Sequence, residues 1–198
     1  MSLVRKPLLS VALVLALAGC AGVVTDDPPR TTERSDATVV DVVDGDTVEV
    51  EYPNGTRETV RLLGVDTPEV RAENDPGEFE GVPDTEAGRT CLRDWGYRAS
   101  EFARTELAGE SVTLVVDPAS DRRGGYDRLL AYVDYDGGRF NERLVERGHA
   151  RLYDATFADR DRYAAAEERA RESGTGLWEC ADPYQESLFL PPVSYAIL

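Results

Sequence analysis

Two short segments of alternating apolar and polar residues, joined by Asn54 and Gly55, constrain the fold more than any other feature. Residues 47–52 and 58–63 alternate as strands with one buried face do. The Asn-Gly pair favours a tight hairpin turn, because both residues tolerate the positive φ that such a turn requires. The sequence therefore predicts an antiparallel hairpin over residues 47–63.

The rest of the central region predicts further strands and then helices. Short runs rich in valine and leucine predict strands at residues 37–43, 111–116 and 129–135. Helical patterns occupy residues 95–107 and 157–172, and Asn141 is expected to cap a short helix ended by Gly148. Residues 70–89 carry proline, glycine and acids without periodicity, which predicts a loop. Five strands without strand–helix alternation predict an α+β, mainly β fold: a small barrel with three helices against it.

The first part of the chain has the pattern of an export signal. Arg5 and Lys6 precede an apolar run at residues 8–17, which is too short to span a membrane. The run ends in Leu-Ala-Gly-Cys20, which resembles the lipobox of secreted lipoproteins; an ordinary signal peptide with an incidental cysteine is the alternative. We therefore expect a signal peptide at residues 1–19, lipidation of Cys20, and a protein anchored at the extracellular face of the membrane, or secreted.

The composition also divides the remainder of the chain. Residues 20–36 are polar and contain two adjacent prolines, which predicts a flexible linker between the lipid and the domain. The domain itself is expected over residues 37–180. Residues 181–198 mix apolar stretches with prolines, so this extension either packs on the domain or is disordered, and its structure is left open.

Two cysteines fall inside or at the edge of the domain. Cys91 and Cys180 are an even pair in a chain sent to an oxidising compartment, which favours a disulfide over two free buried thiols. The bond would close a loop of about 90 residues, which stabilises by roughly 3–5 kcal/mol in the chain-entropy model. The chain has one histidine and no CxxC motif, so a zinc site is not expected.

The charge of the chain is strongly acidic, with 38 acidic residues against 22 basic ones and a net charge of −16. This balance alone argues against nucleic-acid binding, because phosphate neutralisation supplies much of that affinity. Lys6 is the only lysine, however, and a diffuse acidic surface of this kind suits concentrated salt. At about 1 M salt the Debye length is roughly 3 Å, so distant carboxylates barely repel a phosphate chain. The alternative is an acidic protein of ordinary salt conditions with a neutral or acidic substrate.

Two acidic segments carry the residue types of a hard-cation site. Asp44 and Asp46 lie two residues apart at the start of a strand, so both side chains point to one side. In the segment at residues 66–69, Pro68 interrupts the strand ladder and frees a carbonyl for a cation. Carboxylates, a carbonyl and waters favour a site of the calcium type, although the spacing is not that of an EF-hand.

Two arginines accompany these acids. Arg61 lies in the strand that leads into Asp66, and Arg128 precedes the strand at residues 129–135. Arginine beside an apolar strand is suited to binding phosphate through two hydrogen bonds. Either arginine alone would more often be a structural ion-pair partner, so it is their combination with the acidic segments that favours a phosphate site.

The segments VVDGDTVEV, VRLLGVDTPE, YDRLLAYV and FNERLVERGHARLY, in this order and spacing, resemble the staphylococcal nuclease (thermonuclease) family over roughly residues 37–180. The resemblance implies a five-stranded OB-fold barrel with three helices. The lipobox-like segment and the scarcity of lysine add the expectation of a secreted lipoprotein form from a haloarchaeon. It implies a monomeric Ca²⁺-dependent nuclease that hydrolyses DNA and RNA by in-line attack of water. The alternative is a non-catalytic OB module on the cell surface that binds nucleic acid or protein; such relatives typically lack the site residues, which are all present here.

The resemblance assigns a metal site and a base. Asp46 and Asp66 would ligate Ca²⁺ through their carboxylates, and Thr67 through its main-chain carbonyl. Asp44 would not bind the metal directly but would help to hold these ligands in position. Glu69 would act as the general base or orient the attacking water.

The resemblance also assigns the phosphate-binding side chains. Arg61 and Arg128 would bind the phosphate and stabilise charge in the transition state, and Tyr126 and Tyr153 would contact the nucleotide. The family commonly has glycine where this chain has Asp127. A carboxylate at that position could pair with Arg128 and weaken its hold on phosphate.

Overall fold

The computed structural model describes residues 31–181 of the chain. The predicted signal peptide, Cys20, most of the predicted linker and residues 182–198 lie outside the described residues. Within the described part, no helix is both long and apolar enough to cross a membrane.

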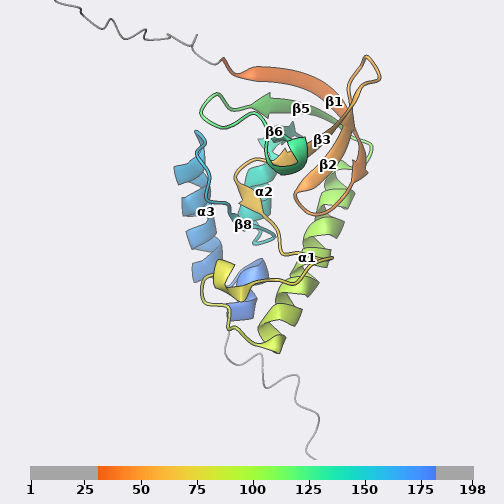
Figure 1. Ribbon diagram of the computed structural model, residues 1–198. Helices are drawn as coiled ribbons and strands as arrows, with labels where there is room; N and C mark the ends of the chain where they lie inside the picture. Colours follow the sequence, from red (N-terminus) through yellow and green to blue (C-terminus); the bar gives the residue numbers. More distant parts are fainter. Residues whose placement is uncertain (1–30, 182–198) are drawn as a thin grey trace, which may run out of the picture.

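Five strands close into a barrel, as the sequence predicts (Figure 1). They are β1 (Glu33–Val42), β2 (Thr47–Glu51), β3 (Arg57–Leu62), β5 (Ser111–Val116) and β6 (Leu129–Tyr135). The strands pair antiparallel in the order β3-β2-β1-β5-β6, and a parallel pairing of β3 with β6 closes the ring. The predicted α+β, mainly β fold with an OB-type barrel is therefore confirmed.

The β2–β3 hairpin forms where the Asn-Gly pair predicts it. Gly55 has a φ of +82°, a value that glycine adopts without strain. The alternation of the two strands places Val48, Val50, Val60 and Leu62 inside the barrel, each at most 1% exposed. Burying one such side chain stabilises the fold by about 1.5–3 kcal/mol, so the hairpin pattern fixes the register of both strands.

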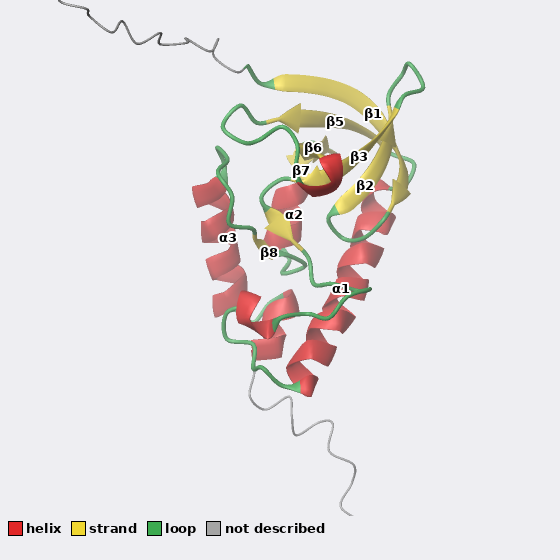
Figure 2. Ribbon diagram, in the orientation of Figure 1, coloured by secondary structure: helices red, strands yellow, loops and turns green. Residues whose placement is uncertain are grey.

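Three α-helices lie beyond one end of the barrel, as Figures 1 and 2 show. They are α1 (Glu86–Leu107), α2 (Phe140–Glu146) and α3 (Arg160–Glu172). Ala103 and Leu107 of α1, Leu144 and Val145 of α2, and Tyr163 of α3 are buried in the same apolar core as the barrel residues. The helices thus cap the barrel core instead of forming a separate domain.

The predicted start of α1 at residue 95 is wrong, because the helix begins at Glu86. The Thr85 side chain caps it by accepting a hydrogen bond from the Gly88 N–H at 3.1 Å. The predicted loop at residues 70–89 therefore includes the first turn of α1, and it also contains the short helix η1 (Pro76–Glu78).

The start of the first strand also needs correction. Strand β1 begins at Glu33 and not at residue 37, and Glu33 pairs with Val116 of β5. Residues 33–36, which the composition assigns to the linker, are therefore part of the barrel. At the other end of the domain, α3 begins at Arg160, later than the predicted residue 157.

The predicted role of Asn141 as a helix cap is wrong as well. Asn141 lies inside α2 and is fully buried. Its side-chain oxygen accepts a hydrogen bond from the Val133 N–H at 2.9 Å, and its amide nitrogen donates to the Leu63 carbonyl at 3.0 Å. The side chain therefore ties α2 to β6 and to the end of β3, because buried backbone groups must find partners.

A second apolar cluster lies beside α1. It contains Phe79, Val82, Leu92, Ala170, Leu177, Trp178 and Cys180. The helix η3 (Gly176–Ala181) supplies the last three of these, and a disulfide joins Cys180 to Cys91 of α1. The structure thus makes the cysteine pairing expected from the sequence and anchors the segment after Glu69 to α1.

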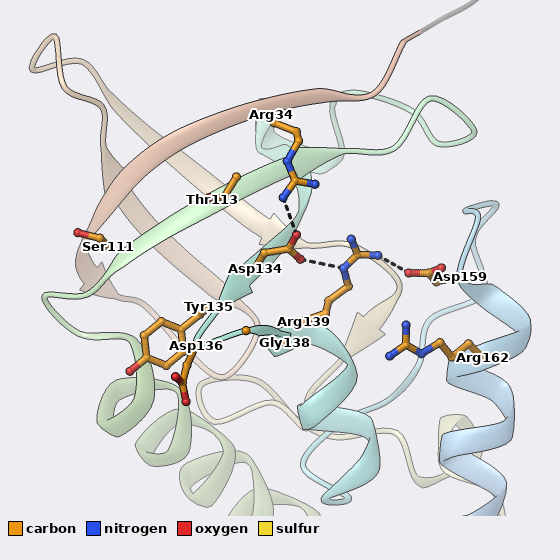
Figure 3. A pocket seen from close by; sticks show the side chains of 11 residues that line it. Arg34, Ser111, Thr113, Asp134, Tyr135, Asp136, Gly138, Arg139, Asp159 and Arg162 are labelled. Atoms are coloured by element: carbon orange, nitrogen blue, oxygen red, sulfur yellow. Dashed lines mark hydrogen bonds and ion pairs between the residues drawn. The ribbon is translucent and has the colours of Figure 1, made fainter.

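A hollow of about 750 Å³ lies where β1, β5 and β6 meet the start of α3 (Figure 3). Asp134 accepts hydrogen bonds from Arg34 at 3.1 Å and from Arg139 at 3.0 Å. Arg139 also pairs with Asp159, so the dashed lines in Figure 3 form one continuous chain of charges. Because these charges balance one another, the network serves to link the barrel to α3.

Candidate active site

The site is built where the chain leaves the barrel after β3. Gly64 turns the chain with a φ of +78°, and a Cβ there would lie 2.5 Å from the Phe157 ring. The turn leads into the two-residue strand β4 (Val65–Asp66), which pairs with β8 (Arg151–Leu152) outside the barrel. This exit carries the predicted segment at residues 66–69 back toward the start of β2.

A small cleft of about 90 Å³ brings together six of the predicted site residues. They come from the β1–β2 turn, β3, the segment after β4 and the residue before β6, and they are Asp44, Asp46, Arg61, Thr67, Glu69 and Arg128. Asp66, Tyr126 and Tyr153 do not line it. The structure therefore assembles most of the predicted site from segments that are distant in sequence.

Arg61 lies between the two predicted metal carboxylates. One guanidinium nitrogen pairs with Asp46, and the other donates to Asp66 Oδ1 at 2.5 Å. Burial lowers the pKa of Arg61, while the neighbouring carboxylates of Asp66 and Asp44 oppose that shift. The arginine side chain is thus held rigidly at the cleft, which a phosphate-binding residue requires.

Asp46 fixes the position of the segment that follows β4. The carboxylate is 4% exposed, and its Oδ2 accepts hydrogen bonds from the Thr67 N–H at 2.7 Å and the Thr67 hydroxyl at 2.9 Å. Gly45 makes this approach possible, since a Cβ there would lie 2.8 Å from the Thr67 methyl group. Asp44 supports the turn by accepting a hydrogen bond from the Asp46 N–H at 3.2 Å.

The oxygen atoms around the cleft suit a hard cation. Asp46 and Asp66 provide carboxylates, and the Thr67 main chain provides a carbonyl, a donor set preferred by Ca²⁺ over softer metals. Among residues 31–181, no group of three histidine, cysteine or acidic side chains has the arrangement of a metal site. A cation held here would therefore need the Thr67 carbonyl and water besides the two carboxylates.

Asp66 has a second partner that the sequence does not reveal. Arg151 of β8 forms an ion pair with Asp66 Oδ2 at 2.7 Å and donates a hydrogen bond to Glu78 at 3.0 Å. The pairing of Asp66 with Arg151 across β4 and β8 brings the two together. Because β8 has only two residues, no strand pattern in the sequence predicts this contact.

Glu69 faces the cleft with an exposed carboxylate. Partial desolvation raises its pKa, and the nearby carboxylates of Asp44 and Asp66 raise it further. A carboxylate with a raised pKa is a better proton acceptor near neutral pH. The structure thus places an accessible carboxylate in the same cleft as two guanidinium groups.

The second guanidinium belongs to Arg128, at the start of β6. Its Nε donates to the Gly125 carbonyl at 3.0 Å, and its other end reaches toward Thr47. Asp127 does not pair with it: the Asp127 carboxylate is 90% exposed and lies 3.8 Å from Arg123. The pairing considered for Asp127 is therefore wrong, because its exposed carboxylate pairs with Arg123 instead.

Comparison with known proteins places these motifs in a family. Residues 59–180 match the family described as staphylococcal nuclease homologue. The chain belongs to the staphylococcal nuclease family. It is 42% identical to an uncharacterized protein of Methanocaldococcus jannaschii over 147 residues, which cover 71% of this chain and 70% of that protein.

Relatives of lower identity include proteins named as nucleases. A thermonuclease of Staphylococcus hyicus is 31% identical over 142 residues, covering 71% of this chain and 73% of the relative. The endonuclease YncB of Bacillus subtilis is 33% identical over 139 residues, but the match covers only 58% of that protein. These nuclease relatives support a nuclease function at the level of the staphylococcal nuclease family.

The two predicted nucleotide-contacting tyrosines differ in placement. Tyr126 is 97% exposed, and its ring centre lies 5.7 Å from the Arg128 guanidinium. Tyr153 is 48% exposed, follows β8, and donates its N–H to the Gly64 carbonyl at 3.0 Å. Both rings are exposed beyond the cleft, with Tyr126 next to Arg128 and Tyr153 near β4.

His149 takes no part in the cleft. Its ring stacks on Phe102 with the ring centres 4.6 Å apart. Burial lowers the pKa of His149 to about 4, with the cations Arg147 and Arg98 adding to the shift. The imidazole is therefore neutral at ordinary pH and packs as an aromatic side chain.

Proposed function

We propose that the protein is a Ca²⁺-dependent nuclease that hydrolyses the phosphodiester bonds of DNA and RNA by in-line attack of water. The observation that carries the proposal is the cleft, in which an exposed Glu69 faces two guanidinium groups, Arg61 and Arg128. The thermonuclease and endonucleases among its relatives support the same reaction. No nucleophilic side chain is needed for this chemistry, because water is the nucleophile.

Each residue of the cleft has a task in the proposed reaction. Arg61 and Arg128 hold the non-bridging oxygens of the phosphate and stabilise the charge that grows on them, which is usually the largest catalytic contribution. Glu69 accepts the proton of the attacking water or orients that water for in-line attack. Asp46 keeps the segment from Thr67 to Glu69 in place through its hydrogen bonds to Thr67.

Ca²⁺ would be held by Asp46, Asp66 and the Thr67 carbonyl, with Asp44 behind them. When bound, it supplies Lewis-acid polarisation of a phosphoryl oxygen and additional positive charge. The requirement for a cation of this type follows from the all-oxygen donor set and from the acids that surround the cleft.

The proposed setting is extracellular. The lipobox-like segment ending in Cys20 supports a lipid-anchored or secreted monomer on the outer face of the cell, and the near absence of lysine supports a haloarchaeal source. Concentrated salt would screen the net charge of −16, so that the local arginines decide the interaction with phosphate.

Cleavage of single-stranded DNA and RNA, measured with and without Ca²⁺ across a range of salt concentrations, tests the proposal. Glu69→Gln and Arg61→Ala should each lower kcat by about 10²–10⁴-fold, as expected for a proton acceptor and a charge stabiliser. Glu101→Gln, an exposed change on α1, serves as the matched control and should cleave normally. Undiminished cleavage by Glu69→Gln or under strong chelation would refute the mechanism, and binding without cleavage would indicate the alternative OB binding module.

A further inference from the structure

The segment after Glu69 turns back and places one buried side chain against it. Asn74 is 4% exposed, its Oδ1 accepts a hydrogen bond from the Glu69 N–H at 2.7 Å, and its Nδ2 donates to the Glu69 carbonyl at 2.9 Å. A neighbouring strand would make the same pair of bonds to a residue's backbone. Because Glu69 lies beyond the end of β4, the Asn74 amide substitutes for a strand at the point where the ladder has ended.

Asn74 is itself held by the structure that follows it. The Asp75 side chain caps η1 by accepting a hydrogen bond from the Gly77 N–H at 2.9 Å. Phe79 and Val82, just beyond η1, are buried in the second apolar cluster that the disulfide joins to α1. The Asn74 amide is therefore presented from a fixed turn and does not depend on a free loop.

The same turn contacts the other side of the cleft. Glu78, the last residue of η1, accepts a hydrogen bond from Arg151, and Arg151 also forms an ion pair with Asp66. The segment at residues 70–82 thus contacts the backbone of Glu69 directly, and it is linked to the carboxylate of Asp66 through Arg151. Residues 70–82, which belong to the predicted loop, therefore pack against the site and support it.

We propose that Asn74 is a positioning residue for Glu69: its amide fixes the Glu69 backbone so that the carboxylate keeps its place in the cleft. The inference rests on the proposed function of Glu69. A base must lie within hydrogen-bond reach of the water it activates, and a displacement of about 1 Å can cost about 10²-fold in rate. Asn74 touches no reacting atom and acts only through Glu69.

A double-mutant cycle with Glu69 tests the proposal. Asn74→Ala should lower kcat by about 10–100-fold with KM unchanged within about twofold, because the base is displaced while the arginines are not. Asn74→Asp keeps the acceptor for the Glu69 N–H but sets a buried carboxylate against the Glu69 carbonyl, so it should lose at least as much activity as Asn74→Ala. In the Glu69→Gln background, Asn74→Ala should cost less than about threefold, since no base is left to displace. Asn54→Ala, which removes an exposed asparagine bonded to the Thr56 N–H, is the matched control and should leave kcat unchanged.

Equal losses in the two backgrounds would overturn the proposal, because they would assign Asn74 a general structural role. An unchanged kcat in folded Asn74→Ala would overturn it as well. Thermal unfolding of each variant verifies that the protein is folded at the temperature at which kcat is compared.

Hydrogen exchange separates this inference from the proposed function. The Glu69 amide should exchange faster in Asn74→Ala, while the Leu62 amide, bonded to the Asp46 carbonyl in the barrel, should keep its protection. Wild-type protein that cleaves no nucleic acid would refute the proposed function, yet the exchange of Glu69 would still decide whether Asn74 holds it. Retained protection of Glu69 in Asn74→Ala would refute the positioning role.

Discussion

A methyl group at Gly96 would press α1 against the segment that carries Glu69. A Cβ at this position would lie 2.4 Å from the Pro68 carbonyl oxygen and 3.0 Å from a methyl carbon of Val70. An ordinary contact is about 3.5 Å, so Gly96→Ala must shift either α1 or the Pro68 backbone by roughly 1 Å. Helix α1 has 22 residues and is fixed by the disulfide, whereas Pro68 lies beyond a two-residue strand. We therefore expect the segment with Glu69 to yield.

The expected effect on activity is larger than the effect on stability. Alanine is favoured over glycine inside a helix by about 0.8–1.0 kcal/mol, and overpacking costs about 1–3 kcal/mol. These terms partly cancel, so the free energy of unfolding should fall by no more than about 2 kcal/mol. A displacement of the proposed base by about 1 Å, in contrast, lowers kcat by about 10²-fold.

Steady-state cleavage of single-stranded DNA and urea unfolding of the same preparation measure the two effects for Gly96→Ala. Thr90→Ala, on the exposed face of α1, is the control for a change in helix propensity without a new contact. Full activity in folded Gly96→Ala would refute the reasoning, since it would show that the contact with Pro68 does not set the position of Glu69. A large loss of stability together with normal kcat would show that α1 yields instead.

Three further predictions concern the surroundings of the cleft and the fold. Asp127→Gly should raise the free energy of unfolding by up to about 1 kcal/mol without lowering cleavage, because glycine accepts the φ of +59° more readily. Thermal unfolding measures the change, and a destabilised variant would contradict this prediction. Burial holds the pKa of His149 at about 4, below its ordinary value of 6.5, so its contribution to stability is lost as pH falls from about 6.5 toward 4. His149→Phe, which keeps the stacking on Phe102, should flatten that part of the stability–pH profile in urea titrations, and an unchanged slope would argue against it. Replacing both Cys91 and Cys180 by serine should lower the free energy of unfolding by about 4–5 kcal/mol, since the bond spans a sequence separation of 89; a loss below about 1 kcal/mol in urea would exclude this mechanism.

The barrel could be predicted from the sequence because its determinants are local. The alternation of β2 and β3 and the turn at Asn54 and Gly55 specify a hairpin without reference to the rest of the chain. The strands β5 (Ser111–Val116) and β6 (Leu129–Tyr135) have the bounds that their apolar runs predict. The order of the five strands around the barrel, including the parallel pairing of β3 with β6, follows from the family resemblance and not from these local patterns.

The first half of α1 escaped prediction because most residues of its buried face, apart from Leu92, are small. Gly88, Leu92, Gly96 and Ser100 follow at intervals of four and are all buried. Small side chains contribute little to an apolar pattern. Their spacing of four residues is nevertheless that of one face of a helix, and it is the signal from which the start of α1 could have been predicted. The small side chains are explained by what they face, since Gly88 and Gly96 lie against the carbonyl groups of Pro83 and Pro68.

The residues of the candidate site could be predicted from the sequence. The residues that hold them in place could not, because they lie far from the motifs or in segments without a pattern. Asp46 contacts Thr67 within one recognisable pair of motifs. Arg151, in contrast, reaches Asp66 only because two-residue strands pair across most of the domain, and Asn74 reaches Glu69 only because η1 turns the chain back. In the proposed mechanism Arg61, Glu69 and Arg128 contact the reacting groups directly, so replacing one of them should lower kcat by orders of magnitude. The supporting residues act through position, so their loss should lower kcat partially and depend on the residue they hold, which is the signature that separates the two classes experimentally.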